Sequence, residues 1–356
     1  MSNLDSLFSP VAVGDVELAN RFVMAPLTRC RAPGHLANAL MAEYYSQRAS
    51  AGLVITECTM VTPDTSTFGD DPGIYSDEQV EAWKQVTDAV HAKGGKIFMQ
   101  IWHGGRAAHP SFNGGKEAVS ASAIAIEGET HTPEGKQPYS VPRELTKAEI
   151  AAIVDDFRQG AANAIKAGFD GVEVHGANGY LIDEFLRESA NQRTDEYGGP
   201  IENRARFLFE VLDAVTAEIG AGRVGLRLSP LNSFQSMKTA DPVAWISWLA
   251  KALNRYQLAY LHVMRTDFMG LQSADVLTPV RADYQGHLMV NMGYSAAEAA
   301  ADIDAGKVDS VAFGTAILAN PDFPARVKAG AELNTPNPDT FYTPGAVGYT
   351  DYPFMA

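Results

Sequence analysis

Short runs of apolar residues recur along the whole chain, and stretches with helical periodicity separate them. The runs are continuously apolar rather than alternating, as is typical of parallel strands that are covered on both faces. Several runs follow a helical stretch that ends in glycine, which terminates a helix at little conformational cost. Eight runs have the character of such strands: NRFVMAPL (20–27), GLVITE (52–57), KIFMQIW (96–102), DGVEVHG (170–176), VGLRLS (224–229), LAYLHVM (258–264), HLMVNM (287–292) and SVAFG (310–314).

Polar residues mark where several of the helices begin. A Ser or Thr followed three residues later by Glu or Gln predicts a capping box, in which each side chain bonds the backbone N–H of the other residue. An Asp directly before a Pro predicts an N-cap with proline in the first turn. These signals occur at Ser76 with Gln79, Thr146 with Glu149, Ser295 with Glu298, and Asp241 with Pro242.

The alternation of strands and helices predicts the fold class. Eight strand–helix units within 356 residues indicate an α/β protein with a (β/α)8 TIM barrel, as a single domain over residues 1–356. A doubly wound open sheet is the alternative. It is disfavoured because no GxGxxG motif opens the first helix after the first strand.

Two segments fall outside the repeating pattern. Residues 8–20 alternate around a Gly-Asp pair and predict an N-terminal β-hairpin that closes the N-terminal end of the barrel. Residues 103–145 follow the third strand and are too long for an ordinary loop. Because they leave the carboxyl side of the barrel, we expect them to form a capping insertion over the active site.

The net charge of −15 changes which partners are plausible. An acidic chain repels phosphate backbones and anionic membrane surfaces, so nucleic acid and lipid are poor partners. The two cysteines, Cys30 and Cys58, are too few for a disulfide framework and suit a reducing compartment. We find no signal peptide and no run of about 18 apolar residues. We therefore expect a cytoplasmic protein.

Polar side chains gather at the predicted carboxyl ends of the strands, where barrel enzymes place their chemistry. Arg227 is the most informative of them, because a guanidinium between Leu226 and Leu228 is costly to bury unless something pairs with it. Either a barrel carboxylate such as Glu57 or Glu173 pairs with it, or it stabilises an anion that binds or forms in the site.

Other strand ends offer groups that a ligand can use. Gln100 has a donor and acceptors, as a heterocyclic amide edge requires, although an internally satisfied amide fits equally well. Thr28 alone is more typical of a cap. Gly293 and Gly314 follow the last two strands, where such barrels often bind phosphate through backbone N–H groups, yet each is also an ordinary turn residue.

The stretch HGANGYLIDEFL (175–186) places three polar side chains within six residues at the end of the fourth strand. A lone histidine there is more often structural. His175 and Asn178 together can donate to one ligand oxygen, and Tyr180 can deliver a proton nearby. The combination predicts an electrophilic pair with a general acid. No Ser/His/Asp arrangement, metal-ligand cluster or Walker-type loop competes with it.

Several motifs of the chain are similar to those of the old yellow enzymes, which are FMN-dependent ene-reductases on a (β/α)8 barrel. The resemblance extends from about residue 6 to 355, and its central block is highly specific. Thr28 stands where one branch of the family has cysteine, so the chain resembles the threonine branch. The motifs are APLTRCRA (25–32), EYYSQRASAGLVITE (43–57), QIWHGGR (100–106), FDGVEVHGANGYLIDEFLRESANQRTDEYGGPIENRARF (169–207), AFGTAILANPDFPAR (312–326) and FYTPGAVGYTDYPF (341–354).

The resemblance implies FMN as the cofactor and gives roles to the polar groups at the strand ends. Tyr180 is the implied proton donor, and His175 with Asn178 is implied to hold the substrate oxygen. The positive charge of Arg227 would stabilise the anionic reduced flavin. The other implied contacts are Thr28, Gln100, Pro26 and Cys58 around the flavin ring, Gly293, Gly314 and Thr315 at the phosphate, and Trp102 and Tyr342 in the substrate pocket.

The implied reaction has two halves that share one site. NADPH or NADH passes a hydride to flavin N5 and leaves. An α,β-unsaturated aldehyde, ketone, imide or nitroalkene then binds, its β carbon takes the hydride, and Tyr180 protonates its α carbon. The implied partner is therefore a small activated alkene, and the protein is expected to be a monomer or a homodimer.

Thr315 departs from the family pattern, which has arginine after the glycine of the last strand. A hydroxyl and a backbone N–H can still bind phosphate, but without the charge. Loss of a charged hydrogen bond weakens binding by about 1.5–3 kcal/mol, or roughly 10- to 150-fold. Arg265, after the sixth strand, is a candidate substitute. We therefore expect the purified protein to lack part of its flavin.

Two other functions stay open at the level of sequence. A flavin-free lyase or isomerase could use His175 and Tyr180 for acid–base work, although no strand end offers a Schiff-base lysine or clustered carboxylates for a metal. A catalytically silent barrel that only binds its ligand is the other alternative, because of Thr315. Flavin colour and NAD(P)H oxidation separate both from an ene-reductase.

Overall fold

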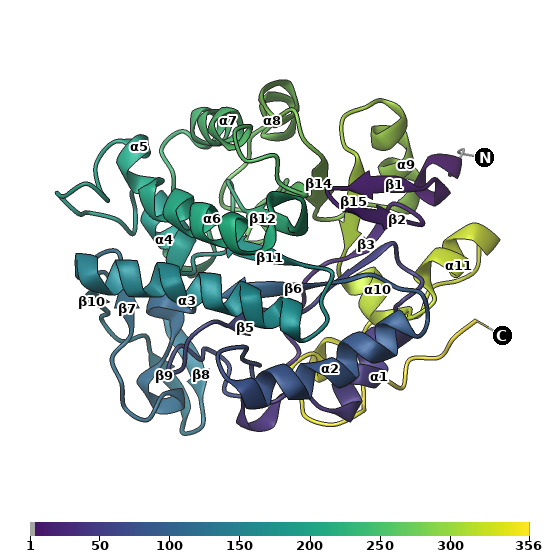
Figure 1. Cartoon of the computed structure of the whole chain (residues 1–356), viewed down its shortest axis with the longest axis horizontal. Helices are drawn as coiled ribbons and strands as arrows, with labels where there is room; N and C mark the ends of the chain where they lie inside the picture. Colours follow the sequence, from purple (N-terminus) through teal and green to yellow (C-terminus); the bar gives the residue numbers. More distant parts are fainter. Residues whose placement is uncertain (1–3, 356) are drawn as a thin grey trace.

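The computed structural model describes residues 4–355 and contains a closed barrel of parallel strands (Figure 1). The first strand of the barrel pairs with the last, and pairing of β11 with β6 completes the ring. Each strand lies within one of the eight runs expected from the sequence, so the (β/α)8 prediction is confirmed. The barrel strands are β3 (Phe22–Met24), β4 (Leu53–Ile55), β6 (Ile97–Trp102), β11 (Gly171–Gly176), β12 (Val224–Leu228), β13 (Tyr260–Met264), β14 (Leu288–Asn291) and β15 (Ser310–Phe313).

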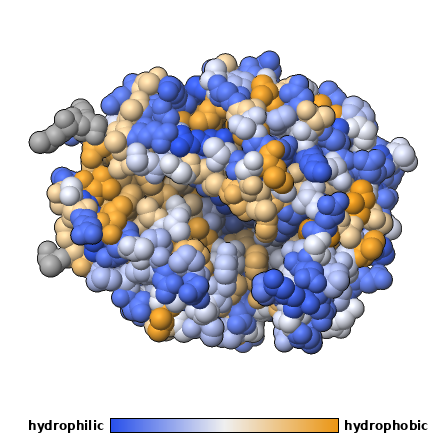
Figure 2. Space-filling model, turned by 180° about the vertical axis from the view of Figure 1, so that it is seen from behind, coloured by the Kyte–Doolittle hydropathy of each residue, from blue (hydrophilic) through white to orange (hydrophobic). Residues whose placement is uncertain are grey.

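Helices surround the barrel, and their amphipathic faces pack on the strands to form the main hydrophobic core. The face in Figure 2 is mostly hydrophilic, with separate apolar areas and a hollow near its middle. Within residues 4–355, no helix is both long and apolar enough to cross a membrane. The helices are α1 (Ala39–Gln47), α2 (Asp77–His91), α3 (Lys147–Lys166), α4 (Leu181–Leu186), α5 (Ile201–Arg204), α6 (Arg206–Ile219), α7 (Pro242–Leu253), α8 (Leu277–Asp283), α9 (Ala296–Asp304), α10 (Thr315–Ala319) and α11 (Phe323–Ala329).

The predicted caps form at three of the four helix starts. Both bonds of the capping box are present at the starts of α2 and α3, and an Asp caps α7 before its proline. At the start of α9 only one of the two predicted capping-box bonds forms, so the prediction is wrong for the other. Ser295 accepts from the backbone N–H of Glu298, but the Glu298 carboxylate instead pairs with Arg265, at 2.6 Å. The charged partner competes successfully with the weaker return bond to the backbone.

A hairpin packs under the barrel at its N-terminal end. β1 (Val11–Val13) and β2 (Val16–Leu18) are antiparallel, and their apolar side chains join a cluster with residues of β3, β4 and β13. The turn residue Gly14 has φ +57°, and a Cβ there would lie 2.1 Å from the carbonyl oxygen of Gly222. Only glycine permits this close approach. The backbone N–H of Asp15 donates to the same carbonyl at 2.9 Å.

Residues 103–145 fold into small sheets beside the carboxyl ends of the strands. β8 (Glu129–Thr132) and β9 (Gly135–Pro138) form an antiparallel hairpin, and β7 (Val119–Ser120) pairs with β10 (Arg143–Glu144). Arg106 is buried and donates to the carbonyl oxygens of Ile124 and Gln235. The segment is thereby tied to the loop that follows β12. A further short strand, β5 (Thr59–Met60), continues the line of β4 and pairs with β6.

Candidate active site

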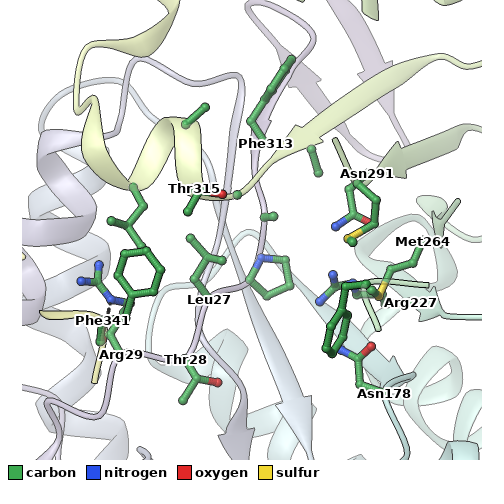
Figure 3. Close-up of a pocket in the computed structure, with 18 of the residues that line it drawn as sticks. Leu27, Thr28, Arg29, Asn178, Arg227, Met264, Asn291, Phe313, Thr315 and Phe341 are labelled. Atoms are coloured by element: carbon green, nitrogen blue, oxygen red, sulfur yellow. Dashed lines mark hydrogen bonds between the residues drawn. The ribbon is translucent and has the colours of Figure 1, made fainter. Parts of the chain in front are cut away.

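A cavity of about 530 Å³ opens at the carboxyl ends of the strands, which is the size of a small-molecule site. In Figure 3, Arg227 and Asn178 lie on one side of it and Thr28 and Phe341 on the other. The predicted site residues that line it are Pro26, Thr28, Asn178, Tyr180, Arg227, Gly293, Gly314, Thr315 and Tyr342.

Four predicted site residues do not form the cavity wall, and three of them contact residues that do. The Cys58 sulfur lies 3.4 Å from the hydroxyl of Thr28. The rings of Trp102 and His175 both pack edge-on against Tyr180, each with centroids 5.1 Å apart. Gln100, at the same level of the barrel, donates to Glu173 at 2.7 Å.

Arg227 comes from β12 and is buried, with no hydrogen-bond partner for its Nε. Among the described residues no carboxylate forms an ion pair with it. Glu57 accepts from Tyr45 and from the backbone of Arg29 instead, and Glu173 is bound to Gln100 and His262. Burial lowers the pKa of Arg227, and the nearby Glu173 opposes this shift. The guanidinium stays charged and has a donor available to a ligand.

The carboxylate of Glu173 is the counter-charge beneath the cavity. Its two oxygens are bound by Gln100 at 2.7 Å and by the His262 ring at 2.8 Å. Burial favours its neutral form, but the charges and hydrogen bonds around it, foremost His262 and then Arg227, leave its pKa lowered. Sequence reasoning considered Glu173 only as a partner for Arg227 and did not identify His262, because a buried histidine in an apolar strand gives no local signal.

His175, next to the last residue of β11, is a neutral imidazole. Burial, followed by the positive charge of Arg227, holds its pKa well below the usual range. Its Nδ1 accepts the backbone N–H of Ala177 at 3.2 Å. The proton therefore resides on Nε2, which leaves that nitrogen as a hydrogen-bond donor.

Tyr180 precedes α4 and is almost completely buried between aromatic rings. This burial raises the pKa of its phenol well above the usual range, so the group keeps its proton at neutral pH. A neutral phenol on the cavity wall can donate a proton to a bound molecule.

Asn178 lies in the turn between these two residues, with φ +60°. Its backbone N–H donates to the Ser229 hydroxyl at 2.8 Å, and its Oδ1 accepts from Asn232 at 2.8 Å. The amino group of its side chain is left for the cavity. The sequence did not indicate Ser229 or Asn232, because both contacts are made across more than fifty positions of the chain.

The far end of the cavity is formed by the ends of β14 and β15. Gly293 has φ +69° and open space where a Cβ would stand, and Thr315 begins α10. Arg265 does not reach the wall. Its Nε donates to the carbonyl of Met292, and its other nitrogens bond Glu298. Of the described wall residues only Arg29 and Arg227 are basic, so this end lacks the charge that arginine would bring.

Aromatic residues from three separate loops and from the C-terminal tail line the cavity. Phe68 and Tyr342 lie parallel, with ring centroids 6.4 Å apart, and Phe234 contacts Phe268 at 5.2 Å. The tail that carries Tyr342 is held by Arg29, whose guanidinium donates to the carbonyls of Phe341 and Gly348. Only Tyr342 was expected here, since loop aromatics carry no periodic signal.

Comparison with known proteins agrees with this geometry. The model of the NADH:flavin oxidoreductase / NADH oxidase family matches residues 6–334. The chain is 53% identical, over 99% of its length and 98% of the relative's, to a probable flavin mononucleotide-dependent alkene reductase of Leishmania infantum. The old yellow enzyme from Trypanosoma cruzi superposes with a TM-score of 0.97, at 43% identity over 99% of this chain and 100% of that one. Morphinone reductase in complex with tetrahydroNAD superposes with a TM-score of 0.94, at 44% identity over 99% and 98% of the two chains.

Proposed function

The chain belongs to the NADH:flavin oxidoreductase / NADH oxidase family as an FMN-dependent old yellow enzyme, and from this we propose that its cavity reduces activated alkenes at the expense of NADPH or NADH. The substrates are small α,β-unsaturated aldehydes, ketones, imides or nitroalkenes. One observation carries the proposal. Arg227, which is buried with an unpaired Nε, shares one cavity with Asn178 and Tyr180, and the ring of His175 packs edge-on against Tyr180.

The residues around the cavity fit FMN. The unpaired, buried Nε of Arg227 is a donor that a ligand with acceptor atoms would satisfy. When bound, FMN supplies two-electron transfer between the nicotinamide and the alkene. The residues that would hold its ring are Pro26, Thr28, Cys58, Gln100 and Arg227, and those at its phosphate are Gly293, Gly314 and Thr315.

The substrate oxygen is proposed to bind between Nε2–H of His175 and the side-chain amino group of Asn178. Two donors on one carbonyl or nitro oxygen withdraw electron density from the alkene, which makes the β carbon electrophilic. Both groups are neutral, so they polarise the substrate oxygen without placing a full positive charge beside it.

Tyr180 then gives its proton to the α carbon. Its raised pKa keeps the phenol protonated until a carbanion-like centre develops beside it. Trp102 behind Tyr180 and Tyr342 on the cavity wall are proposed to set the size of alkene that fits.

We propose a monomer or homodimer in the cytoplasm, with no nucleic acid or membrane as a partner. The acidic composition and the two unpaired cysteines, Cys30 and Cys58, support this proposal.

The visible absorption spectrum tests the function directly. We expect the purified protein, with added FMN where needed, to show a perturbed flavin spectrum that NADPH or NADH bleaches without oxygen. Addition of cyclohexenone should restore the colour. A protein that leaves added FMN unperturbed would contradict the proposal and favour a flavin-free enzyme or a silent binding protein.

A further inference from the structure

We infer that Asn232, which is buried behind the cavity wall, is a positioning residue that fixes which end of the Asn178 side chain meets the substrate. The inference rests on the proposed function, in which Asn178 donates to the substrate oxygen. Asn232 follows β12 and is 1% exposed. Its Nδ2 donates to Oδ1 of Asn178 at 2.8 Å.

This bond matters because a carboxamide has two opposite ends. One end is a carbonyl that only accepts, and the other is an amino group that only donates. A rotation of the Asn178 side chain by half a turn would exchange them and present an acceptor to the substrate oxygen. With Oδ1 held by Asn232, the amino group is the end left for the cavity.

The orientation of Asn232 is itself set by the backbone. The N–H of Phe234 donates to its Oδ1 at 3.4 Å, so the amino end of Asn232 is the end that faces Asn178. The two hydrogen bonds form a chain that runs from the Phe234 N–H through the side chains of Asn232 and Asn178 to the cavity. Because the backbone N–H at its start cannot rotate, it fixes which end of each carboxamide points toward the cavity.

The loops that carry both asparagines are joined without help from the Asn232 side chain. Arg187 donates to the backbone carbonyls of Ser229 and Asn232, and the N–H of Asn232 donates to the Ser229 carbonyl at 3.1 Å. The N–H of Asn178 is bound to the Ser229 hydroxyl. Substitution of the side chain at 232 therefore leaves the backbone positions supported.

The test compares cyclohexenone binding to the FMN-loaded wild type and to Asn232→Asp, Asn232→Ala and Asn178→Ala, by titration of the flavin spectrum. Asn178→Ala loses one neutral hydrogen bond, which corresponds to about 2- to 13-fold weaker binding. Asn232→Asp should weaken binding further than Asn178→Ala, because a carboxylate can only accept. The carboxylate introduced at position 232 attracts the amino group of Asn178, which turns the Asn178 carbonyl toward the substrate oxygen.

Asn232→Ala should weaken binding by only about twofold, because the freed carboxamide spends roughly half its time in the competent orientation. The matched control is Asn203→Asp, whose side chain donates to the Gly198 carbonyl away from the cavity and whose charge change is the same. It should bind cyclohexenone as the wild type does. In steady-state assays the effects at 232 should raise KM for cyclohexenone and leave the rate of flavin bleaching by NADPH unchanged.

The double variant Asn178→Ala/Asn232→Asp decides between positioning and a general structural effect. If Asn232 acts through Asn178, the second substitution adds nothing to the first. If the two substitutions weakened binding by independent factors, or if Asn232→Asp bound cyclohexenone as the wild type does, the inference would be overturned. The proposed function would not be affected by either result. An Asn178→Ala protein with wild-type binding would remove the proposed role of Asn178, and the inference with it. If Asn232→Asp does not fold, Asn232→Ala gives the same decision. It should weaken binding about twofold in the wild-type background and have no effect in the Asn178→Ala background.

Discussion

Arg227 shows how a single residue reports on what its site binds. A buried guanidinium with an unpaired Nε costs free energy unless a ligand satisfies it, and Glu57 and Glu173, the two carboxylates considered as its partners, are bound by other residues. Replacement by Ala should weaken FMN binding by about 10- to 150-fold, the equivalent of one charged hydrogen bond. Fluorescence titration of FMN into the apoprotein measures this change.

The control for this variant lies directly before the start of the strand that carries Arg227. Arg223→Ala removes a guanidinium that donates to the Asp170 carbonyl, at the N-terminal side of the barrel. It should bind FMN with the wild-type dissociation constant. If Arg227→Ala also bound normally, the buried charge would have no part in cofactor binding.

Tyr180 allows the two halves of the reaction to be separated. In Tyr180→Phe the ring still packs on Trp102 and His175, but the proposed proton donor is gone. Bleaching of the flavin by NADPH should continue at the wild-type rate, while reduction of cyclohexenone falls by about 10²- to 10⁴-fold. Stopped-flow absorbance of each half-reaction gives both rates.

Tyr139→Phe is the matched control, since Tyr139 packs against the same aromatic cluster and loses the same hydroxyl. Both half-reactions should keep their rates in this variant. Unchanged alkene reduction in Tyr180→Phe would assign the proton to another group.

The N-terminal hairpin is the element whose fit depends most on one glycine. Gly14→Ala combines φ +57° with a Cβ placed 2.1 Å from the Gly222 carbonyl oxygen, so the hairpin must shift away from the barrel. We expect a loss of about 2–4 kcal/mol in the free energy of unfolding, from backbone strain and overpacking together. Urea denaturation followed by circular dichroism measures it.

Gly94 separates these two contributions. It has φ +74° but nothing within 4 Å of where a Cβ would stand, so Gly94→Ala should cost only about 1 kcal/mol. Equal losses in the two variants would show that the contact with Gly222 is unimportant. Cyclohexenone reduction should be unaffected in both, because the hairpin lies at the opposite end of the barrel from the cavity.

For the molecule as a whole, the sequence predicted the features that depend on residues close together in the chain. Continuous apolar runs identified every barrel strand, and the Ser76 and Thr146 caps formed because both partners lie within one turn. The box at Ser295 failed in part because Arg265 comes from thirty-three positions away. Asn232 was not predicted for the same reason, since its partner becomes a neighbour only when the barrel closes.

Cofactor affinity is a property of the whole molecule, because a ligand that binds only the folded state raises its stability. Thr315 lies on the cavity wall where the family usually has arginine, and the described wall residues include no Asp or Glu. Thr315→Arg should therefore add an uncompensated positive charge at the end of the cavity proposed to hold the phosphate. We expect FMN to bind at least tenfold more tightly, which raises the stability at saturating FMN by about 1.4 kcal/mol. For a chain of this length that is roughly 2 °C in the melting temperature.

Riboflavin tests whether this gain comes from the phosphate. It has the same ring without the phosphate, so its stabilisation of the wild type and of Thr315→Arg should be equal. Thr315→Val removes the hydroxyl proposed to bind the phosphate, so it should be stabilised less than the wild type by FMN and equally by riboflavin. Thermal denaturation with FMN, with riboflavin and without ligand measures all three proteins. If Thr315→Arg gained equally from riboflavin, the charge would act on the ring instead. If wild-type protein held FMN fully through extensive dialysis, the missing arginine would already be replaced by backbone groups around Gly293 and Gly314.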